Sequence, residues 1–503
     1  MNSQIFIGQA NGENLYLNPK YANRHGLIAG ATGTGKTVTL QGLAESFSDI
    51  GVPVFLADVK GDLSGLGGIA DKLHPKVEER ITTLGMQPYE KRGYPVEFWD
   101  MFGASGKPVR TTIAEMGPQL LSRLIDLNDT QEGILTLCFE YTEDEKLPLL
   151  DLKDLNSTLE YLRDEGKQIG GPYARLSKAS IAAIQRRLLT LERDGGDVFF
   201  GETALDYRDL IQCADDGRGH INILAAHKLI QSPRIYSTFL LWLLAELFDE
   251  LPEVGDQDKP KFVFFFDEAH LLFNDTPKVF IEKVEQVVRL IRSKGVGIFF
   301  ISQSPGDIPD RILSQLGSRV QHALRAYTPK ERKVVRAASQ SFRSNPKVNT
   351  EKMITEMGVG EALVSVLQDK GVPSMVEHTL IRPPYSRIGP LNTAQREELM
   401  GQSPYKDRYG ESLDRESAHE ILSARLADKE REEQQALEQQ QEQKEQQAEA
   451  KAKYKRASLK KKTGRRSNRQ GIFESFFKSL ARQLGSGLGR KLLRTIVNVL
   501  LRK

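Results

Sequence analysis

The hydrophobic pattern of the chain alternates between two kinds of segment. Short, continuous apolar runs are followed by longer segments whose apolar residues recur at helical spacing, such as 38–45, 235–248 and 279–294. Continuous apolar runs are typical of strands buried on both faces, and their alternation with helices predicts an α/β fold with a mainly parallel sheet. The runs expected to form this sheet are residues 27–29, 52–57, 96–100, 220–224, 262–266, 295–303 and 319–325.

Two turn signals predict β-hairpins beside this core. Asn11-Gly12 lies between two short apolar runs near the N-terminus, and Asp369-Lys370-Gly371 lies between the runs 362–367 and 375–381. Residues that tolerate positive φ favour the tight turns that join antiparallel strands. We therefore expect a short antiparallel pair at each of these places.

The middle and the end of the chain depart from the alternation. Residues 117–195 contain only segments of helical periodicity, which predicts an all-helical insertion. Residues 411–455 are rich in Glu, Gln, Ala and Lys, which predicts a long polar helix or a partly disordered arm rather than a coiled coil. The predicted parts are 1–116 and 196–390 as the two halves of the core, 117–195 as the insertion, 391–470 as a polar, basic arm and 471–503 as basic amphipathic helices.

Charge is distributed unevenly along the chain. The net charge is +3, but residues 451–503 hold 17 Lys and Arg against one acidic residue, which gives this tail about +16 and the rest about −13. A basic amphipathic tail suits an anionic membrane surface, a nucleic acid or a protein partner. The alternative is a helix that packs on its own domain and leaves a solvated basic face.

Composition also bears on the compartment. The two cysteines, Cys138 and Cys213, are too few for a disulfide framework and fit a reducing environment. Residues 1–6 lack the pattern of a signal peptide, and the longest apolar run, 239–247, is too short to span a bilayer. We expect a cytoplasmic protein, peripheral at the inner membrane face if the tail binds lipid.

One stretch between a core strand and its helix carries a phosphate-binding motif. Residues 30–37 fit the pattern G-x-x-x-x-G-K-[ST], the P-loop. Its glycines let several backbone N–H groups point at one anion, and the start of the next helix adds partial positive charge. Lys36 is expected to contact the β- and γ-phosphates of ATP, and the Thr37 hydroxyl to ligate Mg²⁺. The expected nucleotide-binding residues are Gly30, Ala31, Thr32, Gly33, Thr34, Gly35, Lys36 and Thr37.

Two acidic residues follow the apolar run 262–266. The carboxyl ends of parallel strands are where ligands bind in an open α/β sheet, so this Asp-Glu pair is expected to lie near the P-loop. Asp267 would hold Mg²⁺, and Glu268 would polarise the water that attacks the γ-phosphate.

Polar residues end two further strands. Gln303 either contacts the γ-phosphate and reports hydrolysis, or caps the end of its strand. Asp58, Lys60 and Asp62 follow the run 52–57, where they face the nucleotide or a polymer substrate, or simply form a charged loop.

Together these motifs resemble those of the HerA/FtsK group of P-loop ATPases, and more narrowly those of the bacterial HerA-helicase-like proteins. The resemblance covers about residues 20–385 and is carried by 30–37, by the loop 58–61 and by the segment 292–305. It implies a RecA-like fold and a homo-oligomer, a hexameric ring with ATP sites between subunits.

The resemblance also implies roles for single residues. Gln303 would sense the γ-phosphate, and Arg292 would be an arginine finger that reaches a neighbour's site, with Arg289 as the competing candidate. Two solvated helix arginines are the plain alternative. The sequence shows neither the N-terminal β-barrel of HerA-type helicases nor the membrane spans and DNA-reading domain of FtsK-type translocases. The resemblance therefore supports the motor core and leaves the substrate open.

Two functions fit these observations. The first is Mg-dependent ATP hydrolysis that drives an oligomeric DNA translocase or helicase. The second is an ATP-gated assembly or membrane-associated scaffold, in which the nucleotide state controls partner binding through the tail. Stimulation of hydrolysis by nucleic acid is expected for the first, and liposome binding that depends on residues 471–503 for the second.

Overall fold

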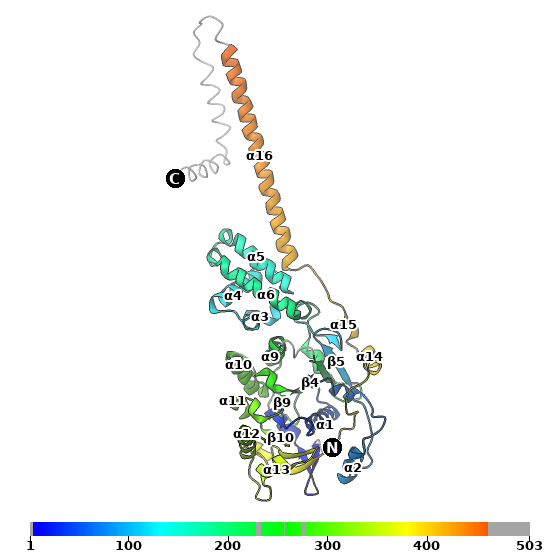
Figure 1. Cartoon of the computed structure of the whole chain (residues 1–503). Helices are drawn as coiled ribbons and strands as arrows, with labels where there is room; N and C mark the ends of the chain where they lie inside the picture. The colour runs from blue at the N-terminus through cyan, green and yellow to red at the C-terminus, as the bar shows by residue number, and fades with distance from the viewer. Residues whose placement is uncertain (1–3, 228–232, 256, 274–277, 461–503) are drawn as a thin grey trace. The chain divides into compact units, whose positions relative to one another are not determined.

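The computed structural model describes residues 4–227, 233–255, 257–273 and 278–460 (Figure 1). The predicted helices at 471–503 lie outside the described residues. The sheet at the centre of the chain has twelve strands. In spatial order they are β2 (Glu13–Leu17), β1 (Ile5–Ala10), β12 (Glu377–Ile381), β11 (Glu361–Ser365), β10 (Ser318–His322), β3 (Gly26–Ala29), β9 (Val296–Ser302), β8 (Phe262–Phe266), β4 (Val54–Asp58), β7 (Ile221–Ala225), β5 (Val96–Asp100) and β6 (Lys107–Pro108).

The sheet is mixed and mainly parallel, as the apolar runs predicted. All neighbours from β10 to β6 are parallel. The four pairs from β2 to β10 are antiparallel, and they include the two predicted hairpins, β1–β2 and β11–β12. Asn11, Gly12, Lys370 and Gly371 all have positive φ, which is what such tight turns require. The hairpins also pair with each other through β1 and β12, and so extend the parallel part of the sheet at one edge.

Helices cover both faces of the parallel part. The alternating side chains of β8 explain this, since Phe262, Phe264 and Phe266 pack into one hydrophobic cluster, and Val263 and Phe265 into another. Helix α1 (Lys36–Asp49) packs in the second cluster, whereas α9 (Pro233–Glu250) and α10 (Lys278–Leu290) pack in the first. The remaining helices are α2 (Pro75–Thr83), α3 (Ile113–Leu124), α4 (Asp129–Asp144), α5 (Leu152–Ile169), α6 (Lys178–Leu191), α7 (Asp197–Phe199), α8 (Tyr207–Leu210), α11 (Asp310–Leu313), α12 (Pro329–Gln340), α13 (Thr350–Glu356), α14 (Thr393–Gly401), α15 (Lys406–Gly410) and α16 (Ala418–Lys460).

Helices α4 to α6, and the part of α3 from Gly117 onward, fall in the segment 117–195 that was predicted to be helical, whereas α3 itself begins at Ile113. Local sequence sets where three of them begin: the side chains of Thr112, Asn128 and Asp151 cap the first turns of α3, α4 and α5 in reciprocal capping boxes. Their buried apolar residues belong to the same cluster that covers one face of the sheet. The helical part is therefore packed on the core, and its limits as a separate insertion stay a prediction.

The segment that follows β12 packs on the core as far as α15. Tyr409 in α15 is fully buried, its ring lies 5.2 Å from that of Trp99 in β5, and its hydroxyl donates to Asp209 at 2.6 Å. A buried ion pair between Glu97 and Lys107 also contacts Ser403. The chain divides into two compact units, residues 1–424 and 425–503.

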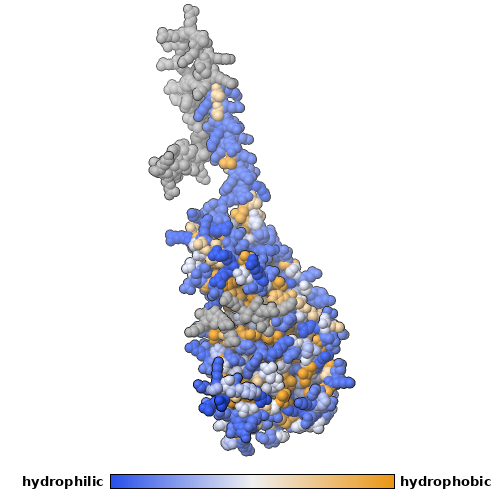
Figure 2. All heavy atoms as spheres, viewed as in Figure 1, coloured by the Kyte–Doolittle hydropathy of each residue, from blue (hydrophilic) through white to orange (hydrophobic). Residues whose placement is uncertain are grey.

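Helix α16 begins in the first unit and continues into the second, and residues 418–460 form it in the part of the chain for which a long polar helix was one of the two predictions. Its surface is predominantly hydrophilic (Figure 2). Such a helix is supported mainly by its composition and by pairs one turn apart, such as Asp428 with Arg431. Among the described residues, no helix is both long and apolar enough to cross a bilayer.

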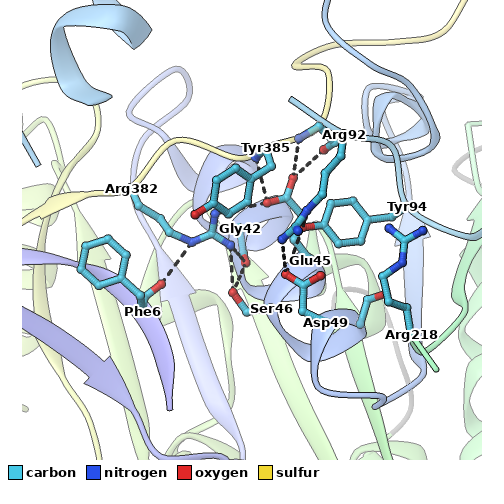
Figure 3. Close-up of polar contacts among 12 residues, drawn as sticks. Phe6, Gly42, Glu45, Ser46, Asp49, Arg92, Tyr94, Arg218, Arg382 and Tyr385 are labelled. Carbon is cyan, nitrogen blue, oxygen red and sulfur yellow. Dashed lines mark hydrogen bonds and ion pairs between the residues drawn. The ribbon is translucent and has the colours of Figure 1, made fainter. Parts of the chain in front are cut away.

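A buried ion pair ties the helix after the P-loop to the segment that follows β12. The guanidinium of Arg382 points at α1 (Figure 3), where it contacts Glu45 at 3.2 Å, Ser46 Oγ at 2.8 Å and the carbonyl oxygen of Gly42. Its Nε donates to the carbonyl oxygen of Phe6 at 3.1 Å, which adds β1 to the same contact. One side chain thus joins α1, β1 and β12.

The other partner of this ion pair is satisfied by backbone as well as by charge. Glu45 is fully buried and accepts from the backbone N–H groups of Tyr385 and Ser386 at 3.0 and 2.9 Å and from the Ser386 hydroxyl at 2.6 Å. One turn later on α1, Asp49 accepts from Arg92 at 2.7 Å. These contacts fix the position of the helix whose first turn forms part of the P-loop.

Candidate nucleotide site

Four adjacent parallel strands bring the predicted site residues to one edge of the sheet. Strands β3, β9, β8 and β4 lie side by side in that order. The P-loop follows β3, Gln303 follows β9, Asp267 and Glu268 follow β8, and Lys60 lies just after β4. Because the carboxyl ends of parallel strands share an edge, residues far apart in sequence meet there.

The backbone of the P-loop requires glycine at two positions for steric reasons. Gly35 has φ 117° and lies directly before α1. A side chain on Gly30 would place its Cβ 2.5 Å from the Cβ of His322 and 2.9 Å from Thr34 Oγ1. The loop is therefore held against β10, and the Ala31 N–H donates to the Ala323 carbonyl oxygen at 2.8 Å.

Lys36 is folded back onto its own loop. Its Nζ donates to the carbonyl oxygens of Gly30 at 2.5 Å and Ala31 at 3.0 Å. Burial lowers the pKa of Lys36, and the nearby charge of Lys60 lowers it further, whereas Glu268 and Asp267 oppose the shift. The ammonium group is thus positioned at the loop with carbonyl partners that anionic oxygens can replace.

Asp267 has one satisfied and one unsatisfied oxygen. Its Oδ1 accepts from the backbone N–H of Glu268 at 2.9 Å, whereas Oδ2 is buried and has no hydrogen-bond partner among the described residues. Burial raises the pKa of Asp267 to about 7, with the charge of Lys60 opposing the shift. An orphaned buried carboxylate oxygen calls for an ion or a water, so this atom suits a bound cation.

Glu268 has a strained backbone and several side-chain partners. Its φ of 48° and ψ of 49° lie in the left-handed region, which is costly for a residue other than glycine and is found preferentially at functional sites. Lys60 Nζ lies 2.5 Å from its Oε1, and Gln303 Nε2 donates to its Oε2 at 3.3 Å. His270 Nδ1 lies 3.3 Å from the same Oε2. Burial opposes ionisation, but Lys60, with Gln303 and His270, holds the pKa of Glu268 below its ordinary value.

The last residue of β4, Asp58, organises the loop that carries Lys60. Asp58 is buried and accepts from the backbone N–H groups of Gly61 at 2.7 Å and Leu63 at 3.1 Å, so it shapes the loop. Burial and the charge of Asp62 raise the pKa of Asp58 to about 6. Lys60 itself is 40% exposed and leans over Glu268, which places this loop at the nucleotide edge and not on a remote surface.

The two candidate arginine fingers lie elsewhere in the chain. Arg289 in α10 and Arg292 in the short helix Ile291–Lys294 precede β9, and both line a cavity with residues that precede β3 and β10. Those positions are at the amino ends of the parallel strands, whereas the P-loop is at the carboxyl ends. Neither arginine therefore belongs to the site of its own chain, and a role in a neighbour's site stays a prediction.

The residues present fit ATP and Mg²⁺. The P-loop backbone has the tight geometry of a phosphate cradle. Lys36 Nζ contacts carbonyl oxygens of the same loop. Among the described residues, the buried Oδ2 of Asp267 has no hydrogen-bond partner. Thr37 lies in the first turn of α1, half-buried beside Lys36. Thr37 and Asp267 are therefore the residues that would hold the metal ion.

A phosphate-binding loop, an Asp-Glu pair and a polar strand end on neighbouring parallel strands define the class of P-loop NTPases. Within that class, the chain belongs to the helicase HerA-like C-terminal family, whose sequence model matches residues 4–503. The chain is 22% identical over 371 residues to the DNA double-strand break repair helicase HerA of Saccharolobus solfataricus. That match covers 72% of this chain and 66% of the length of the relative.

Solved structures show a more distant likeness. The bacterial conjugative coupling protein TrwB, in its unbound form, is 14% identical and aligns with a TM-score of 0.49 over 78% of this chain and 91% of its own. VirB4 of Thermoanaerobacter pseudethanolicus is 15% identical, with a TM-score of 0.49 over 76% and 97%. TrwB in complex with ADP and Mg²⁺ is 16% identical, with a TM-score of 0.46 over 73% and 89%. At these identities and scores the likenesses carry no functional conclusion.

Two further groups at this edge are not indicated by the sequence motifs. His270, two residues after Glu268, contacts its carboxylate, and the fully buried hydroxyl of Tyr236 has no hydrogen-bond partner among the described residues. Burial raises the pKa of Tyr236, and the charges of Asp267 and Glu268 raise it further. The short spacing of His270 from the Asp-Glu pair was a usable signal, whereas Tyr236 reaches the site from α9 and only the fold reveals it.

Proposed function

We propose that this chain is an Mg-dependent ATPase that works as an oligomeric DNA translocase or helicase motor. The observation that carries the proposal is the meeting of the P-loop, the Asp-Glu pair, Gln303 and Lys60 at the carboxyl edge of four adjacent strands. Membership of the helicase HerA-like C-terminal family supports it. The name of the Saccharolobus solfataricus relative, a DNA double-strand break repair helicase, makes DNA the substrate to test first.

The proposed roles follow from position and charge. The P-loop backbone, residues 30–37, and Lys36 would bind the phosphates of ATP, and Thr37 and Asp267 would hold Mg²⁺, which neutralises charge on the phosphates when bound. Glu268 would accept the proton of the attacking water, because its lowered pKa keeps it ionised. Gln303, which donates to Glu268 at 3.3 Å, would link the γ-phosphate to the base.

Lys60 holds the proposed base, Glu268, in a less reactive state. While its ammonium lies 2.5 Å from Glu268 Oε1, that oxygen is neutralised and less basic toward water. A phosphate group near Lys60 would compete with Glu268 for the ammonium group. We propose that this exchange frees the base only when nucleotide or nucleic-acid phosphate is in place.

An assembled ring would complete the site. Arg292 lies at the opposite edge of the sheet from its own P-loop, so it would act on the nucleotide of a neighbouring chain, as an arginine finger does. Hydrolysis would then depend on assembly. A hexamer is the assembly that we propose, and sedimentation of the chain with and without nucleotide tests it.

The first test is steady-state ATP hydrolysis with and without double-stranded DNA, beside Glu268→Gln. The variant should bind ATP and fail to turn it over, since the amide cannot accept the proton. Glu282→Gln, an exposed position on α10, is the matched control and should leave the rate unchanged. Hydrolysis by Glu268→Gln at the parent rate would refute the assignment of the base. A rate of ATP hydrolysis that neither DNA nor RNA changes would favour the rival function, an ATP-gated scaffold.

A further inference from the structure

A basic surface lies on helix α12, which packs beside α13 near the hairpin end of the sheet (Figure 1). The chain outside its tail is acidic, since residues 1–450 carry a net charge of about −13. Residues 325–336 reverse this sign, because they hold five Lys and Arg against one acidic residue, which gives +4. The five are Arg325, Lys330, Arg332, Lys333 and Arg336. A local excess of positive charge in an acidic chain fits an anionic partner.

Three of these cations share one exposed face of α12. Arg332, Lys333 and Arg336 are all exposed at helical spacing, whereas Val335 packs into the hydrophobic cluster beneath the helix. Among the described residues, Arg332 and Lys333 have no ion-pair partner. Arg336 approaches Glu351 at 3.7 Å, and the two side chains are 67% and 53% exposed. A pair exposed to this degree is weak, so the face keeps its positive charge.

The acidic residue of α12 is engaged by the start of the helix. Glu331 accepts from the backbone N–H groups of Tyr327 at 2.7 Å and Thr328 at 2.8 Å. Its own N–H donates to the Thr328 hydroxyl at 3.2 Å, which completes a capping box. The carboxylate therefore points at the first turn and does not neutralise the basic face.

An exposed aromatic ring lies at the start of the same helix. Tyr327 directly precedes the cap residue Thr328 and is 83% exposed, the highest value among the exposed large apolar side chains of the described residues. Its backbone N–H is held by Glu331, so the ring has a fixed starting point beside the cations. Cations that contact phosphates and a ring that stacks on a base are together the chemistry of surfaces that bind single-stranded nucleic acid.

The surface is joined to the nucleotide site at two points. The segment 323–327 connects the P-loop to α12, because the Ala323 carbonyl oxygen accepts from the N–H of Ala31 at 2.8 Å. Helix α12 also packs against the short helix Pro305–Asp307, where a Cβ on Gly306 would lie 4.0 Å from Val334 Cγ2. That short helix follows Gln303 in the chain. A ligand on α12 would therefore lie against elements that also form the nucleotide site.

We propose that the surface formed by Tyr327, Arg332, Lys333 and Arg336 binds a single strand of nucleic acid. The three cations contact phosphates of the strand, and the ring stacks on an unpaired base. The inference rests on the proposed function for DNA as the polymer, and it adds a preference for the single strand, since the bases of a duplex are already stacked on one another. A lipid surface fits less well, because the exposed positions of α12, all of them described, hold no large apolar side chain.

The test places a fluorescent reporter on this surface in the full chain. In Tyr327→Trp the introduced indole is exposed, whereas the native Trp99 and Trp242 are 0% and 2% exposed. An oligo(dT) of about 20 nucleotides, longer than one site of this kind, should quench the added emission in the absence of ATP. A duplex of the same length should quench it less than half as much. Tyr16→Trp, in β2, is the matched control and should not respond.

Removing the cations tests the phosphate contacts. Arg332→Gln, Lys333→Gln and Arg336→Gln together, in the reporter chain, should weaken oligo(dT) binding at least about tenfold. They should also lower the slope of log Kd against log salt by about 2, because each phosphate contact on a single strand contributes about 0.7.

A second triple variant removes the same charge from exposed side chains of α6 and should leave affinity within about twofold. It changes Lys178, Arg186 and Arg187 to Gln. It is closely matched, because Arg187 also has a loose partner, Asp126, at 3.7 Å. All six positions are exposed, so an unchanged Tm is expected for both triple variants.

Quenching that the α12 substitutions leave unchanged, or that the α6 substitutions weaken as much, would overturn the proposal. Equal quenching by the duplex would also overturn it, and so would quenching by phosphatidylserine vesicles and not by oligo(dT). The measurement needs neither ATP nor Mg²⁺, so it fails separately from the proposed function. Quenching as expected on a chain whose hydrolysis is unaffected by DNA would keep the surface and refute the motor. Hydrolysis stimulated by DNA without any quenching would do the reverse.

Discussion

Replacing Arg382 by Met tests how the helix after the P-loop is held. Methionine keeps much of the side-chain length but removes the charge and every donor. The change breaks the ion pair with Glu45, which is fully buried, and leaves the carbonyl oxygens of Phe6 and Gly42 without this partner. The substitution lies outside the nucleotide site, so its first effect is on stability.

The size of the effect follows from the contacts in Figure 3. Removing one partner of a buried ion pair costs about 3–5 kcal/mol. Glu45 keeps three donors from Tyr385 and Ser386, which places the expected loss in the lower half of that range. The unfolding entropy of the unit formed by residues 1–424 is about 0.9 kcal/mol per kelvin, so Tm should fall by about 4 °C.

Differential scanning calorimetry measures this shift against two comparison variants. Arg415→Met removes a bidentate pair with Glu202 whose arginine is 56% exposed, and such a pair is worth at most about 1 kcal/mol. Its Tm should fall by no more than about 1 °C. Glu45→Gln combined with Arg382→Met carries no buried charge and should recover at least half of the loss. If the Tm of Arg382→Met falls no further than the Tm of Arg415→Met, the buried ion pair does not stabilise the position of α1.

The same variant has an expected pH dependence. Burial raises the pKa of Glu45 above its ordinary value of 4.5, and Arg382 opposes this, so the substitution raises the folded-state pKa further. A carboxyl group with a raised folded pKa favours folding in its protonated form, and this contribution is lost as pH rises through the folded value. The deficit of Arg382→Met should therefore be larger at pH 8 than at pH 5, and the Glu45→Gln double variant should not show this difference.

Three further outcomes test the nucleotide site. Lys36→Ala should weaken ATP binding at least about tenfold in equilibrium titration, because a charge-assisted phosphate contact is lost; affinity equal to the parent's would contradict the role of the loop. Lys60→Met should raise the rate of ATP hydrolysis without DNA by about two- to fivefold, because the partly exposed ion pair between Lys60 and Glu268 is worth up to about 1 kcal/mol. A fall in this rate would show that Lys60 assists the reaction and does not restrain it. Arg292→Ala should lower the rate of the assembled protein by about 10³ or more, as loss of an arginine finger does, and Arg289→Ala should not; the reverse result would assign the finger to Arg289.

Local patterns were enough to predict every strand of the sheet except the two-residue β6, and to point to the P-loop and the Asp-Glu pair as candidate site motifs. The strand Phe262–Phe266 was predicted because five apolar residues in a row cannot form the amphipathic face of a surface helix, and the structure buries all of them. The hairpin at Asn11-Gly12 was predicted because its turn residues accept positive φ. The P-loop was predicted because the spacing of its glycines, lysine and threonine is itself what forms the phosphate-binding turn. In each case the cause lies within a few neighbouring residues.

Contacts between distant segments could not be predicted in the same way. Nothing near Lys60 in the sequence indicates that its ammonium lies on Glu268, because β4 and β8 become neighbours only in the sheet. The ion pair of Glu45 with Arg382 joins residues more than 300 positions apart. Helices α12 and α13 were also not predicted, since their apolar faces are narrow and become clear only where they pack beside β11.

The most direct test of the central claim is triplex displacement on double-stranded DNA, which reports movement along the duplex and not binding alone. We expect release of the third strand that requires ATP and Mg²⁺, increases with the length of flanking duplex needed to load the protein, and is absent in Lys36→Ala and Glu268→Gln. Hydrolysis of ATP by the parent without any release of the third strand, on substrates with duplex on either side, would contradict the claim that this chain is a DNA motor.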